Sequence, residues 1–386
     1  MDSRINVLHI TRSVEGGMLA HILKLCQDHN NEKFKVFIAA TEPDVFIRNL
    51  DREINVIPCQ IWSKLNVFGD IRAVIKLILI IRDNNIRIVH THGYKAGLVG
   101  RIAAIIAKVP VIIATFHNFI YDRSQKSFQP EIIKAIQRRL AARTDHIITV
   151  SKALAQDLML NEQIKLSKIS TIYSNVNTAK MNQCQLFTYK NKLPNNFINI
   201  VTAARLIKEK GVHVFIKMAE LIARKFPNVH FHIIGDGPEK HKLMELSSVL
   251  KIDQVISFWG YVKDAAALFP YFDIIVIPSL SEGLSITAVE ALYAKKPVVA
   301  SKVGGLPEVI KNHITGLLFK KGDALDCARQ IERLLNNPAL AARLGNEGYK
   351  SVHSWVNSVD FCRETEKIYL YYLNKKGILN HSILQK

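Results

Sequence analysis

The sequence has few cysteines and lacks one common metal-binding pattern. Its 386 residues contain five cysteines, an odd number, and none of them form a C-x-x-C pair. We therefore expect free thiols, mostly packed in the core of a protein from a reducing compartment. No two aspartates stand two positions apart, so the D-x-D metal clamp is absent as well.

The sequence also lacks a hydrophobic run of the length that a leader or a membrane span needs. The N-terminus, "MDSRINVLHITR", has no apolar stretch of the secretory type. The segment "AVIKLILIIRD" is short and contains Lys76, and "GLVGRIAAIIAKVPVIIATF" is divided by Arg101, Lys108 and Pro110. We expect a cytoplasmic protein that is soluble or lies on a membrane surface.

Acidic side chains are scarce relative to basic ones. The net charge is +19, which fits nucleic acid, an anionic membrane surface or a phosphorylated substrate as a partner. Residues 61–152 hold fifteen Lys or Arg against five Asp or Glu, without an Arg-rich tail, which favours a surface patch. The basic amphipathic helix expected at 130–143 suggests loose attachment to the inner face of the membrane. An ordinary core-packed helix with a hydrated basic face is the alternative.

Short apolar runs alternate with amphipathic stretches in two successive series. We expect strands in "INVLHI", "KVFIAA", "INVIP", "IRIVHTH", "VPVIIATFH" and "HIITVS", and then in "INIVTAAR", "VHFHIIG", "QVISFWG", "DIIVIPS", "KPVVAS" and "GLLF". Helices of the first series are expected at 18–29, 66–84, 95–107, 130–143 and 152–160. Such alternation predicts parallel sheets covered on both faces. The predicted fold class is therefore α/β, with two facing, Rossmann-like, doubly wound domains and a ligand cleft between them.

The domain boundaries follow from the same alternation. The segment 176–196 is polar, has no clear periodicity and is interpreted as the connection. We expect an acceptor-binding domain at 1–178 and a donor-binding domain at 179–365. A C-terminal helix at about 366–386 is a candidate to pack back on the first domain.

Ligands of such sheets bind at the carboxyl ends of the strands, which directs attention to the residues after each strand. Gly16 and Gly17 follow the first strand and open a helix, where backbone N–H groups favour an anion, although a plain strand–helix turn fits equally. Arg205 and Lys210 follow the strand "INIVTA" and suit a diphosphate, with solvated surface charge as the alternative. Gly235, in "IIGDGPE", permits close approach of the backbone to a ligand.

The segment "SEGLSITAVE" contains two glutamates with seven residues between them, Glu282 and Glu290. A helix is expected to start near Ser285, so that the nearby backbone amides can hold a phosphate between the two carboxylates. Carboxylates beside an anion are costly unless they bind hydroxyl groups. A nucleotide-sugar has hydroxyls on both sides of its diphosphate, which the pair matches better than a general acid and base would. Two glutamates that simply favour the helix dipole are the alternative.

Together with "ARLIKEKG", "IIGDGPE", "KPVVASKVGGLPEVI" and "TGLLF", this segment resembles the nucleotide-binding domain of the retaining glycosyltransferases of family four, which have the GT-B fold. The N-terminal "EGGM" resembles the glycine loop of that family. The segments "HTHGYKAGLVGRIAA" and "ATFHNF" resemble its acceptor domain. The resemblance extends over nearly the whole chain.

The resemblance implies a role for each matching residue. Arg205 and Lys210 would neutralise the leaving diphosphate, Glu290 would bind the ribose, and Glu282 the sugar hydroxyls. His117 would lie near the reacting carbon, although a core histidine is the alternative. The other implied donor contacts are Gly16, Gly17, Gly235, Gly237, Val262, Gly283, Leu284 and Ser285, with the nucleobase near 258–263. The acceptor-side candidates are His92, Tyr94, Lys95 and Asn118.

The implied activity is retaining transfer of a sugar from a nucleotide-sugar, expected to be a UDP-sugar, to a hydroxyl of a glycan or lipid-linked acceptor. This would be a hexosyltransferase of cell-surface polysaccharide or glycolipid synthesis that needs neither a metal nor a cofactor. The alternatives are a sugar-nucleotide epimerase or phosphorylase on the same fold. A nucleic-acid-binding protein is a second alternative, which only the charge suggests, and we expect no nucleic-acid partner.

The sequence departs from the family pattern at two positions. Lys295 stands where the family usually has a glycine that ends the helix after the second glutamate. We expect Lys295 to adopt the left-handed conformation there, at a cost of about 1 kcal/mol. Asn177 stands where the family has an acidic residue at the end of the first domain.

Overall fold

The computed structural model describes residues 4–14, 16–50, 54–63, 66–119, 131–174, 193–194, 196–358 and 360–379, without the side chains of 131–134, 354 and 356–358. The chain forms two compact units, of which the first comprises Met1–Ser174 and Asp360–Lys386 and the second Asn175–Val359. The expected connection at 176–196, with Asn177 and Cys184, lies almost wholly outside the described residues. The other four cysteines are free and buried, as expected.

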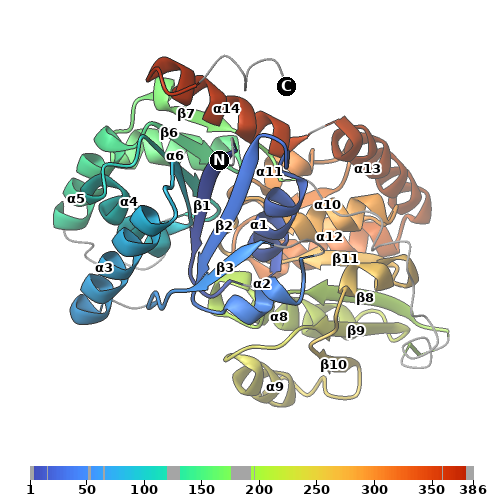
Figure 1. The fold of residues 1–386 in the computed structure, drawn as a ribbon. Coiled ribbons are helices and arrows are strands. Elements are labelled where there is room, and N and C mark those ends of the chain that lie inside the picture. Colours follow the sequence, from blue (N-terminus) through green and yellow to red (C-terminus); the bar gives the residue numbers. More distant parts are fainter. Residues whose placement is uncertain are drawn as a thin grey trace. The chain divides into compact units, whose positions relative to one another are not determined.

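Unit 1 contains a seven-stranded parallel sheet in the order β3-β2-β1-β4-β5-β6-β7 (Figure 1). Its strands are β1 (Ile5–Thr11), β2 (Phe34–Ala40), β3 (Asn55–Pro58), β4 (Ile88–His92), β5 (Val111–Phe116), β6 (His146–Thr149) and β7 (Ile169–Thr171). Its helices are α1 (Gly16–Asp28), α2 (Pro43–Ile47), α3 (Val67–Asp83), α4 (Tyr94–Ile106), α5 (Glu131–Arg143), α6 (Lys152–Glu162), η1 (Leu166–Lys168) and α14 (Phe361–Lys375). The strand order reverses between β1 and β4, the usual position of a ligand in a doubly wound sheet.

Unit 2 contains a six-stranded parallel sheet in the order β10-β9-β8-β11-β12-β13. Its strands are β8 (Ile198–Ala203), β9 (Val229–Ile234), β10 (Ile256–Gly260), β11 (Ile274–Ile277), β12 (Val298–Ser301) and β13 (Leu317–Phe319). Its helices are η4 (Lys208–Lys210), α8 (Val212–Ala223), α9 (Lys240–Val249), η5 (Ala265–Tyr271), α10 (Ile286–Tyr293), α11 (Leu306–Val309), α12 (Ala324–Leu335) and α13 (Pro338–Ser358). The reversal lies between β8 and β11. The predicted α/β class with two parallel-sheet domains is confirmed.

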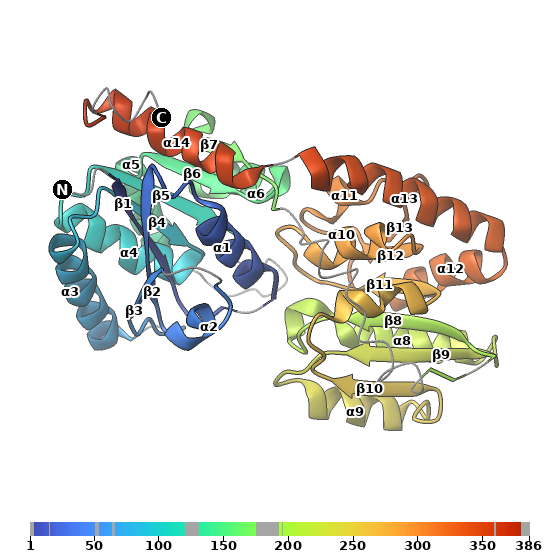
Figure 2. The same cartoon turned by 45° about the vertical axis from the view of Figure 1, so that its right-hand side comes forward.

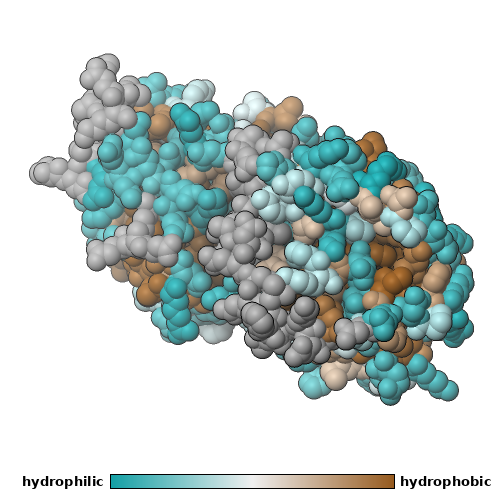
Figure 3. All heavy atoms as spheres, turned by 90° about the vertical axis from the view of Figure 1, so that its right-hand side faces the viewer, coloured by the Kyte–Doolittle hydropathy of each residue, from teal (hydrophilic) through white to brown (hydrophobic). Residues whose placement is uncertain are grey.

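Alternation along the strands separates two cores in unit 1. Leu8 and Ile10 of β1 pack with α3 and α4, whereas Val36 and Ile38 of β2 pack with α1. Because successive side chains of a strand point to opposite faces, His9 lies on the α1 face of the sheet. On one side of the molecule, hydrophilic side chains cover much of the coloured surface, with hydrophobic patches between them (Figure 3), which is ordinary for a protein surface.

The C-terminal helix is the clearest departure from the sequence expectation of a helix at about 366–386. Helix α14 begins at Phe361, because the Asp360 side chain accepts a hydrogen bond of 3.0 Å from the backbone N–H of Arg363 and caps the helix. The helix belongs to unit 1, and it lies beside the sheet of that unit (Figure 2). Among the described helices, none has the length and apolar content that crossing a bilayer requires.

Helix α5 gives only partial information on the expected membrane-binding face. Ile136, assigned to the apolar face, is 39% exposed, whereas Leu140 is buried. Arg139 and Arg143 are exposed. The side chains of its first turn lie outside the described residues.

Candidate active site

Close packing of two backbones brings the turn after β8 against the loop after β11. Gly211 has a φ of +64°, and a Cβ atom there would lie 2.0 Å from the carbonyl oxygen of Pro278. Only glycine permits both that conformation and that contact. The backbone N–H of Leu280 also donates to the carbonyl of Glu209 over 2.8 Å. These contacts place Lys210 beside the segment that contains Glu282.

Lys210 and Glu282 form an ion pair that uses both carboxylate oxygens. The Nζ atom lies 3.0 Å from Oε1 and 2.7 Å from Oε2. The hydroxyl of Ser279 donates to Oε2 over 2.9 Å. The Glu282 side chain is 7% exposed and that of Lys210 is 26% exposed. Glu282 is therefore a buried carboxylate whose two oxygens both have partners.

Helix α10 presents unused backbone donors next to this pair. Ser285 caps the helix by accepting a hydrogen bond of 3.3 Å from the Ala288 N–H, so the expected helix start near Ser285 is confirmed. In the described part of the chain, the backbone N–H groups of Leu284, Ser285 and Ile286 have no hydrogen-bond acceptor. Donors at a helix N-terminus, beside an amine, form a site for an anionic group such as a phosphate.

Glu290 lies on the second turn of α10 and is largely protonated near neutral pH. Burial of its carboxyl, with a smaller contribution from the charge of Asp264, raises its pKa to about 8. The two carboxylates therefore repel a bound anion less than two uncompensated negative charges would. Glu282 is compensated by Lys210, and Glu290 is mostly neutral and able to donate as well as accept a hydrogen bond.

The two glycines of "IIGDGPE" are required by close backbone contacts, which the sequence alone did not indicate. A Cβ atom on Gly235 would lie 1.9 Å from the carbonyl oxygen of Ala204, and one on Gly237 would lie 2.6 Å from that of Leu206. The turn thus packs against the segment that carries Arg205, whose side chain is exposed. These glycines hold the backbone around Arg205 in place, whether or not they also approach a ligand.

The segment expected to bind the nucleobase follows β10. Val262 is buried, and the N–H of Gly235 donates to the carbonyl of Gly260 over 2.8 Å. The Trp259 ring donates to His232 over 3.1 Å. Tyr261 is largely exposed.

Unit 1 gathers histidines on the α1 face of its sheet. His117 and His92, both expected in the site, are buried, and their Nε2 and Nδ1 atoms lie 3.3 Å apart. His9 and His90 stand in register on neighbouring strands, and the expectation from sequence did not include them. The signal was present, since side chains of equal parity on adjacent parallel strands share a face.

The remaining residues expected in unit 1 have different surroundings. The Nζ atom of Lys95 lies 2.5 Å from a carboxylate oxygen of Asp70 and the side chain is buried, so this residue joins α4 to α3. Tyr94 is half-buried, and burial raises the pKa of its phenol. Asn118 is exposed. Gly16 begins α1 with a φ of +59° and has open space around it.

Three groups of side chains in unit 1 are close enough to be considered as metal ligands. They are His9 with His90 and His92, His21 with His92 and His117, and His29 with Cys362 and Glu366. In the first group, Nδ1 of His90 lies 2.5 Å from the Tyr369 hydroxyl and Nε2 lies 2.6 Å from the Thr115 hydroxyl. Because both ring nitrogens of His90 already have partners, this group is better described as a hydrogen-bonded cluster.

Comparison with known families identifies the chain. The model of the glycosyl transferases group 1 matches residues 187–351, and that of glycosyltransferase family 4 matches residues 15–180. The chain belongs to glycosyltransferase family four. In this glycosyltransferase, the group 1 model matches residues of unit 2, and the family 4 model matches mainly residues of unit 1.

Relatives and solved structures agree with this assignment. The chain is 27% identical to the capsular polysaccharide biosynthesis glycosyltransferase CapM of Staphylococcus aureus, over 85% of this chain and 88% of CapM. It is 24% identical to the UDP-Gal:alpha-D-GlcNAc-diphosphoundecaprenol alpha-1,3-galactosyltransferase of Escherichia coli, over 89% and 90%. The crystal structure of Anabaena HepE in complex with UDP and glucose superposes with a TM-score of 0.80 at 18% identity, covering 95% of this chain and 100% of HepE. The fold of this glycosyltransferase is GT-B.

Proposed function

We propose that this glycosyltransferase is a hexosyltransferase that transfers a sugar from a UDP-sugar, with retention of configuration, to a hydroxyl of a glycan or lipid-linked acceptor in cell-surface polysaccharide or glycolipid synthesis. The observation that supports this proposal most is the Lys210–Glu282 pair beside the open N-terminus of α10. The names of the similar proteins refer to UDP, to a capsular polysaccharide and to a diphosphoundecaprenol acceptor, and these suggest the substrate classes.

In the proposed mechanism, the diphosphate binds at the α10 amides. Lys210 and Arg205 stabilise the negative charge that develops as the nucleoside diphosphate leaves. Lys210 then forms an ion pair with both Glu282 and the phosphate. Glu282 accepts hydrogen bonds from sugar hydroxyls. Glu290 binds the ribose. The acceptor hydroxyl attacks the face from which the diphosphate departs, and the phosphate takes its proton.

A thermal-shift panel tests the donor assignment, because a ligand that binds the native state raises Tm. The panel contains UDP, UDP-glucose, UDP-galactose, UDP-N-acetylglucosamine and GDP-mannose. We expect a UDP-sugar to raise Tm for the wild type and not for Lys210→Met. Absence of a shift with every sugar nucleotide at millimolar concentration would overturn the proposal.

Two further measurements address stereochemistry and metal use. The anomeric coupling in the proton NMR spectrum of the product distinguishes retention from inversion, and we expect retention. We propose that protein groups supply the positive charge, so dialysis against EDTA should leave the rate unchanged. A rate that falls after dialysis and returns with Mg²⁺ or Mn²⁺ would contradict this part of the proposal.

We also propose that unit 1 docks on an anionic bilayer through α3. The exposed apolar residues on this helix recur at helical spacing and thus form one stripe: Val67, Phe68, Ile71, Ile75 and Leu79. Phe68 is 82% exposed. Arg72 and Lys76 are exposed beside the stripe, and Trp62 lies over Gly69 at the start of the helix. An apolar stripe flanked by cations complements the acyl chains and headgroups of anionic lipid.

Co-sedimentation with phosphatidylglycerol or phosphatidylcholine vesicles tests this surface. We expect the wild type to sediment with the anionic vesicles, and Phe68→Ser with Ile75→Ser to remain in the supernatant. Leu166→Ser is the matched control, because Leu166 is an exposed leucine of unit 1 outside α3. Equal sedimentation of all variants would contradict the proposal. So would a wild-type dimer that the double substitution converts to monomer without an effect on vesicle binding.

A further inference from the structure

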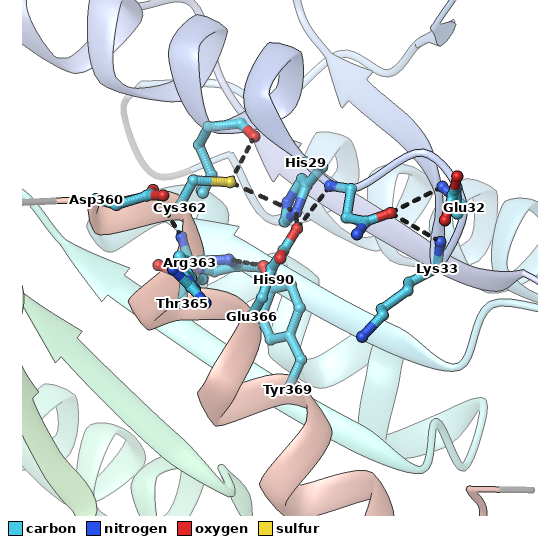
Figure 4. A network of polar contacts seen from close by, with 12 residues as sticks. His29, Glu32, Lys33, His90, Asp360, Cys362, Arg363, Thr365, Glu366 and Tyr369 are labelled. Atoms are coloured by element: carbon cyan, nitrogen blue, oxygen red, sulfur yellow. Dashed lines mark hydrogen bonds and ion pairs between the residues drawn. The ribbon is translucent and has the colours of Figure 1, made fainter. Parts of the chain in front are cut away.

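A chain of hydrogen bonds connects α14 to the carboxyl end of β5 within unit 1. It starts at the Glu366 carboxylate, whose Oε1 lies 2.9 Å from His29 Nδ1 (Figure 4). His29 Nε2 lies 3.2 Å from His9 Nε2. His9 Nδ1 lies 3.0 Å from His92 Nε2, and His92 Nδ1 lies 3.3 Å from His117 Nε2. Each of the three inner histidines uses both of its ring nitrogens in this chain.

At this end of the chain the Glu366 carboxylate can only accept hydrogen bonds. The Cys362 thiol lies 3.8 Å from His29 Nδ1, but it donates to the carbonyl of Leu25 over 3.6 Å. The backbone N–H of Asn30 donates to the same Oε1 atom of Glu366 over 2.8 Å. An ionised carboxylate has no proton to donate. His29 must therefore carry its proton on Nδ1.

This constraint, taken together with a neutral His29, sets the proton on every ring that follows. A neutral imidazole has one N–H and one bare nitrogen. With Nδ1 protonated, His29 accepts at Nε2 from His9, and His9 then accepts at Nδ1 from His92. His92 in turn accepts at Nδ1 from Nε2–H of His117, which leaves Nδ1 of His117 without a proton.

The surroundings favour the neutral form of His92 and His117, the two rings at the far end of the chain. Burial lowers the pKa of His92 and of His117 well below the usual value, and the neighbouring histidines lower both further. Burial also lowers the pKa of His21, whose ring lies 4.8 Å from that of His117, to about 4. His90 stacks on His92 and has a lowered pKa for the same reason. The other groups that face the chain, Tyr369 and Cys362, have raised pKa values and are neutral as well.

We propose that Glu366, acting through His29, His9 and His92, holds His117 in the tautomer whose Nδ1 atom is bare. Glu366 and the three inner histidines are then positioning residues. This inference rests on the proposed function in one respect: a bare Nδ1 atom on His117 can accept a hydrogen bond from a hydroxyl of a substrate. His117 Nδ1 forms no hydrogen bond within the described residues, so it is available for that contact.

The tautomer can be measured without any substrate. Long-range ¹H–¹⁵N correlation spectra of the full chain, labelled with ¹⁵N-histidine, distinguish protonated from bare ring nitrogens, and His117→Gln assigns the signals. For the wild type at pH 7.5 we expect a bare Nδ1 and a protonated Nε2 at His117. In Glu366→Gln, the amide can accept from His29 or donate to it. The hydrogen bonds along this row of side chains can then run in either direction, so that each ring nitrogen of His117 is protonated part of the time. The two His117 ¹⁵N signals should therefore shift towards each other.

Glu364→Gln is the matched control, because Glu364 is an exposed residue of the same helix that pairs with Lys367. It should leave the His117 signals unchanged. His29→Gln interrupts the chain one step further along and should give the same averaging as Glu366→Gln. The proposal is overturned by a protonated Nδ1 at His117 in the wild type, or by unchanged His117 signals in both folded variants.

The spectra also separate this inference from the proposed function. If no sugar nucleotide binds but the wild-type tautomer is as expected and depends on Glu366, the proposed donor fails and the positioning chain stands. If UDP-sugars bind and the tautomer is independent of Glu366, the proposed donor stands and the positioning chain fails.

Discussion

The Nζ atom of Lys210 lies within hydrogen-bond distance of both carboxylate oxygens of Glu282. Before a substrate binds, the cation expected to meet the diphosphate is thus held by the acid expected to meet the sugar. Each group compensates the burial of the other. A bound diphosphate would compete for the same amine. Phosphate binding would therefore weaken the ion pair and let the Glu282 carboxylate form other hydrogen bonds.

Lys210→Met should leave Glu282 buried with only Ser279 as a side-chain partner. Because Lys210 is partly exposed, we expect a loss of about 1–2 kcal/mol in the free energy of unfolding. We also expect at least a tenfold loss of transfer rate. Urea titration and a UDP-sugar transfer assay measure the two effects. Lys208→Met, an exposed lysine of the same turn, should change neither.

Glu290 should make stability depend on pH in a defined window. Its folded pKa of about 8 exceeds the ordinary glutamate pKa of 4.5, so the folded state binds more protons than the unfolded state between these pH values. This contribution to stability is present below pH 4.5 and is lost as pH rises through 8. Glu290→Gln removes the dependence, so its stability relative to wild type should increase from pH 5 to pH 8, as urea titrations at each pH would show. A constant difference across that range would contradict the raised pKa.

Lys295 adopts the left-handed conformation that the sequence predicted, with a φ of +59°, and this expectation is confirmed. Its Nζ atom also lies 4.6 Å from the centre of the Tyr349 ring. Lys295→Ala removes the ring contact and keeps the strain, whereas Lys295→Gly removes both. We expect the glycine variant to be more stable than the alanine variant by about 1 kcal/mol in chemical denaturation. Equal stabilities would show that the helix end relaxes around a side chain at no cost.

Gly235→Ala should disturb the backbone that carries Arg205 even when no ligand is present. The added Cβ atom would overlap the Ala204 carbonyl, so we expect a loss of about 3 kcal/mol or more in unfolding free energy. Gly322→Ala is the control for a left-handed φ without a clash, because Gly322 has a φ of +74° and the nearest atom to an added Cβ would lie 3.8 Å away. It should cost only about 1 kcal/mol. A Gly235→Ala variant of wild-type stability that has lost nucleotide binding would instead assign this glycine to the ligand.

The positions of the proposed donor-side residues were largely predictable, because these residues directly follow strand ends. Arg205, Lys210 and Glu282 follow β8 and β11, and parallel strands bring such positions to one edge of the sheet. The compensation of Glu282 by Lys210 was not predictable, since periodicity gives no side-chain orientation. The contact of His29 with Glu366 joins residues 337 positions apart, and no local pattern indicates which helix closes over a sheet.

Unit 1 is built from two segments of the chain, because α14 returns to it after unit 2. During synthesis on the ribosome, the first 174 residues therefore emerge without the helix that contributes Glu366 and Tyr369. His29 and His90 gain their contacts with Glu366 and Tyr369 only after α14 has been synthesised. A fragment that ends at residue 174 should consequently leave these rings exposed to water and fail to form a stable domain. Unit 2 is continuous in sequence, so it can fold during synthesis, before α14 has emerged.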